Sequence, residues 1–398
     1  MDRSRLEANI RERGLEFFSR IGDAKPSVFN KDWWTGKVMD ACMRNEQFKV
    51  QLFRFIDVLP YLTTSDSLRR HIEEYFAREE AVPGVLKWGI KGVGFGGRLA
   101  MKVLSAAIRK NLEMMAKTFI IGDKPSQTVD RIADLRGQGY AFTLDLLGEA
   151  TLSEREADGY AAGIHDLLDG LSEAQAAWPA LGGGEDGLDW GHAPRINLSI
   201  KPSAMYSQAE PADPNGSVEA MLGRLKPIYR RVVAQGGFLC IDMEMRRLRN
   251  ITLELYRRLR SDPEFRDYPH LGVALQIYMP ETERDLDRLI DWSRREGLPI
   301  SVRLVKGAYW DYEIVIAEQK GWPVPVYTVK PETDVAFERA AETILRNSDV
   351  CHLACGSHNV RSVCAVMEMA RLLDVPEDRY EFQVLYGMAE PFRQALVE

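Results

Sequence analysis

Beyond residue 137, short apolar segments rich in β-branched residues alternate with longer segments that carry apolar residues at helical spacing. The predicted strands are Gly139–Leu146, Arg195–Ile200, Gly237–Ile241, Gly272–Gln276, Pro299–Val305, Val350–Ala354 and Tyr380–Leu385. The predicted helices are Glu154–Trp178, Gly216–Gln235, Asn250–Arg260, Glu281–Glu296, Thr333–Asn347 and Val360–Leu373, with one more after Pro391. This alternation indicates parallel strands joined by crossover helices. So many units of similar size favour a (β/α)8-type barrel over a doubly wound sheet.

The first third of the chain has a different pattern, in which helical spacing predominates. Helices are predicted at Leu6–Ile21, Trp33–Phe55, Ser67–Glu79, Leu99–Thr118 and Val129–Arg136. We therefore expect a helical arm and helical domain over residues 1–136, followed by an α/β barrel over residues 137–398. The sequence ends before an eighth strand and helix, so we expect the barrel to be incomplete at its C-terminus.

Composition narrows the class of protein. The net charge of −7 over 398 residues argues against nucleic acid as the main partner, because phosphate binding needs a basic field. The charged start of the chain is neither a secretory signal nor a transmembrane segment, and no apolar run reaches bilayer length. Five scattered cysteines fit reduced thiols, which favours a cytoplasmic protein.

Polar residues follow the end of every predicted strand. They are Asp145 and Glu149, Lys201, Asp242 and Glu244, Gln276 and Tyr278, Arg303 and Lys306, Ser357, His358 and Asn359, and Gln383 and Tyr386, with apolar Leu385 beside them. Active sites of (β/α) barrels form at the carboxyl ends of the strands. The repetition of this pattern on every strand predicts an active site there.

The segment Ser301–Tyr312 (SVRLVKGAYWDY) is the most informative of these strand ends. A predicted strand ends in cationic residues, Arg303 and Lys306, and Gly307 then permits close backbone approach. Tyr309 and Trp310 add aromatic faces. This combination is suited to a flat, anionic ligand.

Less specific interpretations remain open for several of these residues. Lys201 and Asp242 could form a structural ion pair, and His358 could be a structural histidine. Gln276 could merely cap its strand, and Tyr309 and Trp310 could be ordinary core residues.

Three motifs elsewhere in the chain give weaker signals. Gly92–Gly97 matches a dinucleotide-binding pattern but lacks a preceding strand. Cys351 and Cys355, with the nearby histidines, are too far apart along a strand for zinc, so we expect no metal site. The basic and apolar segment Gly92–Lys110 could touch a membrane surface, although an arm or a packing helix explains it better.

From Gly148–Asp158 (GEATLSEREAD) to Tyr380–Pro391 (YEFQVLYGMAEP), the chain resembles the proline dehydrogenase barrel of bifunctional proline utilisation A proteins. The motifs RLVKGAYWD, SHNVRS and FQVLYGMAEP carry the resemblance. The helical first third resembles the arm and helical domain of these proteins, in the branch without a ribbon-helix-helix DNA-binding segment.

The resemblance implies a non-covalently held FAD and oxidation of L-proline to Δ1-pyrroline-5-carboxylate. It implies that Arg303 lies near flavin N5, with Asp242 and Gln276 close to the isoalloxazine. The other implied cofactor-binding residues are Val305, Lys306, Gly307, Ala308, Trp310, Thr328, His358 and Asn359. For the substrate it implies contacts from Lys201 to the carboxylate and from Tyr309 and Leu385 to the ring, with Glu149 gating the site.

The resemblance also implies partners outside this chain. Electrons would pass to a quinone, which makes peripheral membrane contact plausible, and an aldehyde dehydrogenase module would belong to the full-length parent. The family's last strand and helix, with their pair of carboxylate-binding arginines, have no counterpart here, so we expect this chain to be a fragment of the larger enzyme. Two alternatives stay open: another flavin barrel, such as a methylenetetrahydrofolate reductase-like enzyme, and a non-catalytic truncated product.

Overall fold

The computed structural model describes residues 2–22, 50–51, 54–55, 57–62, 64–76, 120–122, 125–148, 150–178, 181 and 195–397. Several predictions fall outside these ranges. They are the helix expected at 99–118, most of the helix expected at 33–55, the end of the helix expected at 67–79, the glycine motif at 92–97, and Glu149. The described residues divide into two compact units, and each unit is considered by itself.

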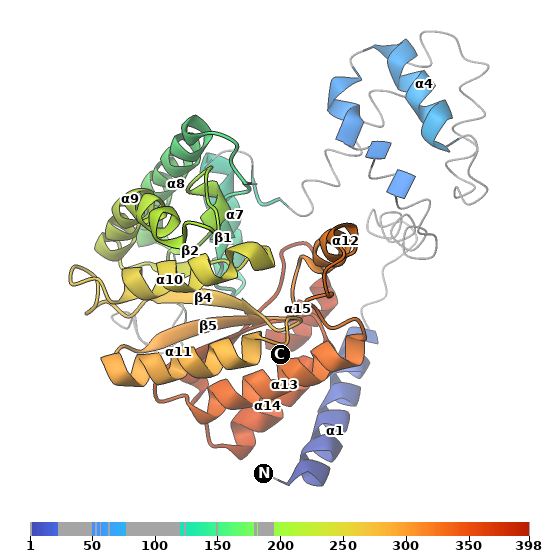
Figure 1. Ribbon diagram of the computed structural model, residues 1–398. Coiled ribbons are helices and arrows are strands. Elements are labelled where there is room, and N and C mark those ends of the chain that lie inside the picture. The colour runs from blue at the N-terminus through green and yellow to red at the C-terminus, as the bar shows by residue number, and fades with distance from the viewer. Residues whose placement is uncertain are drawn as a thin grey trace. The chain divides into compact units, whose positions relative to one another are not determined.

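The larger unit holds a sheet of seven parallel strands in sequential order, and it confirms the predicted (β/α) barrel topology (Figure 1). The strands are β1 (Leu144–Asp145), β2 (Asn197–Ile200), β3 (Phe238–Ile241), β4 (Leu271–Gln276), β5 (Ile300–Val305), β6 (Cys351–Gly356) and β7 (Tyr380–Gln383). Every neighbouring pair is parallel. Among the described residues β1 and β7 form the two edges of the sheet, with no pairing between them.

Crossover helices follow the strands, as the hydrophobic pattern predicts. They are α8 (Glu154–Ala174), α9 (Pro214–Ala234), α10 (Arg249–Arg260), α11 (Thr282–Glu296), α13 (Lys330–Arg346), α14 (Val360–Leu372) and α15 (Glu390–Val397), and α7 (Pro125–Gly137) precedes β1. Short 3-10 turns occur at Gln175–Ala177, Pro202–Ala204, Arg246–Leu248 and Glu377–Arg379. In Figure 1, α10 and α11 run alongside β4 and β5.

The core lies between the sheet and these helices. All six residues of β4 are buried, because the strand is central in the sheet and covered by helices. In helix α10, Leu255, Tyr256 and Leu259 are fully buried, and the Tyr256 hydroxyl donates to the Leu271 carbonyl of β4 at 3.4 Å. Burial of this kind, at roughly 25 cal/mol per Å² of apolar surface, is the main favourable term in folding.

Two local differences from the predicted elements stand out. The first predicted strand, Gly139–Leu146, shrinks to the two residues of β1, which pairs with β2 alone. A helix that the sequence pattern did not predict, α12 (Trp310–Lys320), is inserted between β5 and α13. Its apolar residues do not recur at helical spacing, and β-branched Val315 is 48% exposed, so periodicity gave no signal.

The first helix of the chain is α1 (Arg3–Gly22), and its residues 3–19 belong to the larger unit. Leu6, Ile10 and Phe17 are buried, and they recur at the spacing of one helix face. Ion pairs join this helix to α13 and α14 through Arg3–Glu342 and Arg13–Glu368. Figure 1 shows α1 running beside α13 and α14.

The smaller unit contains, among its described residues, a 3-10 turn at Leu59–Tyr61 and α4 (Ser65–Phe76). Thr64 Oγ1 accepts a hydrogen bond from the Ser67 amide at 3.1 Å, so Thr64 caps the N-terminus of this helix. Phe55, Leu62 and Ile72 are buried in this unit.

Candidate active site

Three residues predicted from different strand ends meet at the carboxyl side of the sheet. Asp242 Oδ1 accepts a hydrogen bond from Arg303 Nη1 at 2.7 Å, and Asp242 Oδ2 lies 3.3 Å from Lys201 Nζ. The side chains retain only 14–19% of their exposure. Since they come from β2, β3 and β5, the parallel topology alone brings them together.

Arg303 is held on three sides. Besides Asp242, its Nη1 donates to Ser199 Oγ at 2.6 Å, and its Nε donates to Gln383 Oε1 at 2.7 Å. Among the described residues, Nη2 forms no hydrogen bond. The planar guanidinium is therefore fixed in orientation and keeps one donor nitrogen for another group.

Lys201 bridges two carboxylates, those of Asp145 on β1 and Asp242. Burial would lower the pKa of Lys201, but the charges and hydrogen bonds of Asp242 and Asp145 raise it above its ordinary value. The pKa of Asp145 is raised by burial, which outweighs the effect of Lys201. Lys201 thus stays protonated and forms an ion pair with Asp242.

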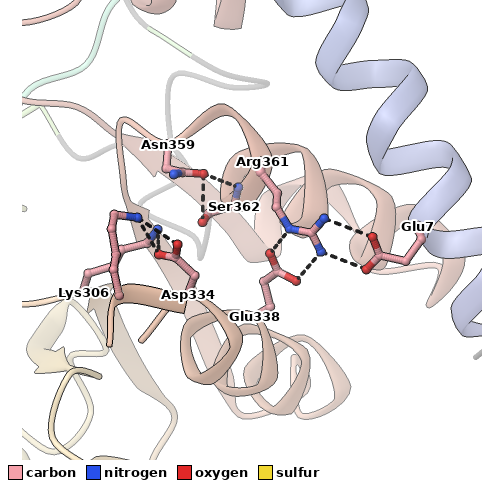
Figure 2. Close-up of polar contacts among 8 residues, drawn as sticks. Glu7, Lys306, Asp334, Glu338, Asn359, Arg361 and Ser362 are labelled. Carbon is pink, nitrogen blue, oxygen red and sulfur yellow. Dashed lines mark hydrogen bonds and ion pairs between the residues drawn. The ribbon is translucent and has the colours of Figure 1, made fainter. Parts of the chain in front are cut away.

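The loop after β5 is tightly constrained. Gly307 has φ +139°, and a β-carbon at this position would lie 2.6 Å from the Tyr278 ring, so only glycine fits. The Ala308 amide donates to Gln276 Oε1 at 2.8 Å. Lys306 forms an ion pair of 2.5 Å with Asp334 on α13 (Figure 2).

The aromatic residues of this loop take different positions. Tyr309 is half-buried and packs against a small apolar cluster that includes Tyr278 and Val326. Trp310 is 40% exposed, and its Nε1 donates to the carbonyl of Tyr327 at 2.8 Å, beside exposed Thr328. Trp310 is therefore not an ordinary core residue, whereas Tyr309 is partly one.

The loop after β6 carries His358 and Asn359. His358 Nε2 accepts a hydrogen bond from the Leu385 amide at 2.9 Å, so the proton of the neutral ring resides on Nδ1. Burial lowers the pKa of His358, which favours this neutral form. Nδ1 is buried and has no hydrogen-bond partner among the described residues. Asn359 caps α14 by accepting from the Ser362 amide at 3.0 Å (Figure 2).

Some residues of the site had no predicted role. Ser199 and Gln383 hold Arg303, Asp145 holds Lys201, and Glu244 holds the turn after Lys201. Asp145, Glu244 and Gln383 do stand in the sequence as strand-end polar residues. Ser199 could have been found from strand alternation, because it lies two residues before Lys201.

Two kinds of feature are absent from the part of the chain that the structure describes. No group of three or more His, Cys, Asp or Glu side chains is arranged to hold a metal ion. No helix there is both long and apolar enough to cross a bilayer.

The sequence and fold place the chain in a known family. The family model for proline dehydrogenase matches residues 128–398, and the model for the proline utilization A N-terminal domain matches residues 7–119. The chain therefore belongs to the proline dehydrogenase family.

Individual relatives agree with this assignment. The bifunctional protein PutA of Klebsiella aerogenes is 30% identical over 73% of this chain and 22% of its own length. The proline dehydrogenase of Deinococcus radiodurans is 26% identical over 72% of this chain and 79% of its own length. The crystal structure of proline utilization A from Bdellovibrio bacteriovorus, inactivated by N-propargylglycine, is 38% identical with a TM-score of 0.86 and covers 98% of this chain. This chain spans 38% of that structure's chain and about a fifth of the PutA relative's length.

Proposed function

We propose that this chain carries the FAD-dependent oxidation of L-proline to Δ1-pyrroline-5-carboxylate, the first step of proline catabolism to glutamate. The observation that carries the proposal is the meeting of Lys201, Asp242 and Arg303 at the carboxyl ends of β2, β3 and β5, in a chain of the proline dehydrogenase family. The reaction removes a hydride from C5 and a proton from the ring nitrogen, and it forms a C=N bond.

The residues present fit a flavin dinucleotide. His358 Nδ1 is a buried donor without a partner among the described residues, and Arg303 keeps Nη2 available. Both suit an anionic or hydrogen-bond-accepting ligand. FAD, when bound, supplies the hydride acceptor.

Each residue group has a proposed part in binding. Arg303 and Asp242, with Gln276, would lie against the isoalloxazine, and the fixed guanidinium would stabilise negative charge there. The phosphates, ribose and adenine would be held by the loops after β5 and β6, with contacts from Val305, Lys306, Gly307, Ala308, Trp310, Thr328, His358 and Asn359. The Lys306 ammonium is a fixed positive charge beside this loop, although Asp334 already pairs with it.

For the substrate, Lys201 would bind the proline carboxylate. Its two carboxylate neighbours hold the ammonium in one place, so it can orient the substrate without moving. Tyr309 and Leu385 would pack on the ring. Glu149, outside the described residues, would gate the entrance.

Membership of this family also supports proposals about partners of the full-length protein. We propose a quinone as the electron acceptor, reached by peripheral contact of a cytoplasmic enzyme with a membrane. An aldehyde dehydrogenase module in the parent chain would consume the product.

Anaerobic titration of the flavin-loaded full-length protein with L-proline tests the proposal. The long-wavelength flavin absorbance should bleach, and dithionite provides the reference for complete reduction. Absence of bleaching at saturating proline would overturn it. Bleaching by NADH with indifference to proline would instead indicate a methylenetetrahydrofolate reductase-like activity.

A further inference from the structure

A chain of hydrogen bonds runs through the loops at the carboxyl ends of five successive strands. The amide and hydroxyl of Thr151, after β1, donate to the Ser203 carbonyl at 3.3 and 3.2 Å. Ser203, after β2, donates from its amide and hydroxyl to Glu244 at 2.8 and 2.6 Å. Gln276 at the end of β4 donates to the Glu244 carbonyl at 2.7 Å and accepts from the Ala308 amide, after β5, at 2.8 Å.

The residues in the middle of this series of hydrogen bonds are buried. Ser203 and Glu244 are each 3% exposed, and Gln276 is 1% exposed. Glu244 has no cation within ion-pair distance among the described residues, so its two carboxylate oxygens depend on the two donors of Ser203. A buried carboxylate without its hydrogen bonds is costly, so this pairing is tightly enforced.

Ser203 in turn fixes the backbone of Lys201. The two residues belong to one tight turn, in which the Ala204 amide donates to the Lys201 carbonyl at 3.1 Å. Pro202 stands between them, and its ring fixes φ. Holding Ser203 therefore holds the point from which the Lys201 side chain extends toward Asp145 and Asp242.

We infer that Glu244 is a positioning residue for proline binding. By accepting two hydrogen bonds from Ser203 it fixes the turn 202–204, and this turn fixes the position of the Lys201 ammonium. The inference rests on the proposed function, in which Lys201 meets the substrate carboxylate. Glu244 itself touches neither substrate nor cofactor in this account.

Two substitutions at Glu244 separate geometry from charge. Glu244→Ala removes both acceptors, whereas Glu244→Gln keeps an oxygen for the Ser203 amide and places its NH2 beside the Ser203 hydroxyl, which can accept. We expect Glu244→Ala to raise the half-saturating proline concentration for flavin reduction by about tenfold or more. Glu244→Gln should restore it to within about threefold of wild type, with the limiting rate of reduction changed less than the half-saturation in both variants.

Glu368→Gln is the matched control. Glu368 is also 3% exposed, but it lies on α14 and pairs with Arg13 and Arg371. It should leave the half-saturation unchanged. Equal half-saturation in wild type and Glu244→Ala would overturn the inference, as would a Gln variant as impaired as the Ala variant, because charge would then be the cause.

Hydrogen–deuterium exchange of the segment 201–206 gives a second readout that needs no turnover. Glu244→Ala should speed exchange in this segment, and Glu368→Gln should not. Unchanged exchange in Glu244→Ala would contradict the claim that Glu244 fixes the turn through Ser203. If Glu244→Ala fails to fold, Ser203→Ala, which removes one donor of the same pair, takes its place in both measurements. If proline does not bleach the wild-type flavin, the proposed function fails, and exchange alone decides whether Glu244 fixes the turn.

Discussion

Carboxyl groups in two parts of the larger unit respond to their surroundings in opposite ways. At the strand ends, burial raises the pKa of Asp145 and of Glu244, despite hydrogen bonds from Lys201 and Ser203. Where α1 meets α13 and α14, burial would likewise raise the pKa of Glu342 and Glu368, but arginine hydrogen bonds lower it. The Arg361 hydrogen bond is the main cause that lowers the pKa of Glu7, and Figure 2 shows Arg361 between Glu7 and Glu338.

This difference separates a site from a structural contact. The α1 contact combines buried apolar residues with ion pairs from Arg3 and Arg13, which are 64% and 35% exposed, and these pairs favour the charged carboxylates. The strand-end cluster consists of Asp145, Lys201, Asp242, Glu244 and Arg303. Within it, burial opposes the ionisation of Asp145 and Glu244. Arrangements of that kind are costly for stability and recur at functional sites.

The largest effect is expected from Asp242→Asn, which leaves Lys201 and Arg303 without their shared counter-charge. Removing one partner of a buried pair costs about 3–5 kcal/mol, so the free energy of unfolding should fall by about that amount in a urea titration. Asp158→Asn, which breaks an exposed pair with Arg224, is the control and should cost under about 1 kcal/mol. Similar losses for both variants would show that the buried cluster is no more costly to disrupt than an exposed ion pair.

Arg303→Met should slow flavin reduction by proline by roughly 10²–10³-fold and lower the flavin potential, since one preorganised charge donor is lost. Stopped-flow absorbance and a redox titration measure the two quantities. Arg294→Met, in an exposed pair with Asp349, is the matched control. If rate and potential are both unchanged, Arg303 has a structural role.

Phe17→Ala tests the apolar part of the α1 contact. Phe17 is 5% exposed and its ring lies 6.1 Å from that of Phe392. Loss of a buried phenylalanine should lower the free energy of unfolding by about 3 kcal/mol. Phe18→Ala, at a neighbouring position that is 59% exposed, should change it by less than about 0.5 kcal/mol. Equal effects would show that α1 does not bury this face.

The smallest expected effect is a pH-dependent loss in the free energy of unfolding when Glu7 is replaced by Gln. Because the folded-state pKa of Glu7 is lowered, its contribution is present above its ordinary pKa of 4.5 and is lost as the pH falls through the folded value. Glu7→Gln should therefore cost under about 1 kcal/mol at pH 7 and progressively less as the pH falls below 4.5, measured by urea unfolding between pH 7 and pH 3. Glu12→Gln, at an exposed position of the same helix, is the matched control. A difference that grows on acidification would contradict the sign.

The sequence could predict the sheet and the meeting of strand-end residues because both depend on short-range pattern and parallel topology. Lys201, Asp242 and Arg303 converge for that reason alone. It could not predict α12, whose apolar residues lack helical periodicity, or the two-residue length of β1. The hydrogen bonds from Arg303 to Ser199 and Gln383, and from Ser203 to Glu244, join residues 41 to 104 positions apart, and no local pattern records them.

The most direct test of the central claim, that the strand-end cluster binds and oxidises proline, is stopped-flow flavin reduction in wild type and Lys201→Met. We predict that proline reduces the wild-type flavin completely and that Lys201→Met raises the half-saturating proline concentration by about tenfold to a hundredfold, the scale of one charged hydrogen bond. Lys226→Met, which breaks a pair with Asp262 outside the cluster, should behave as wild type. The same half-saturation in wild type and Lys201→Met would contradict the assignment of this cluster as the proline site.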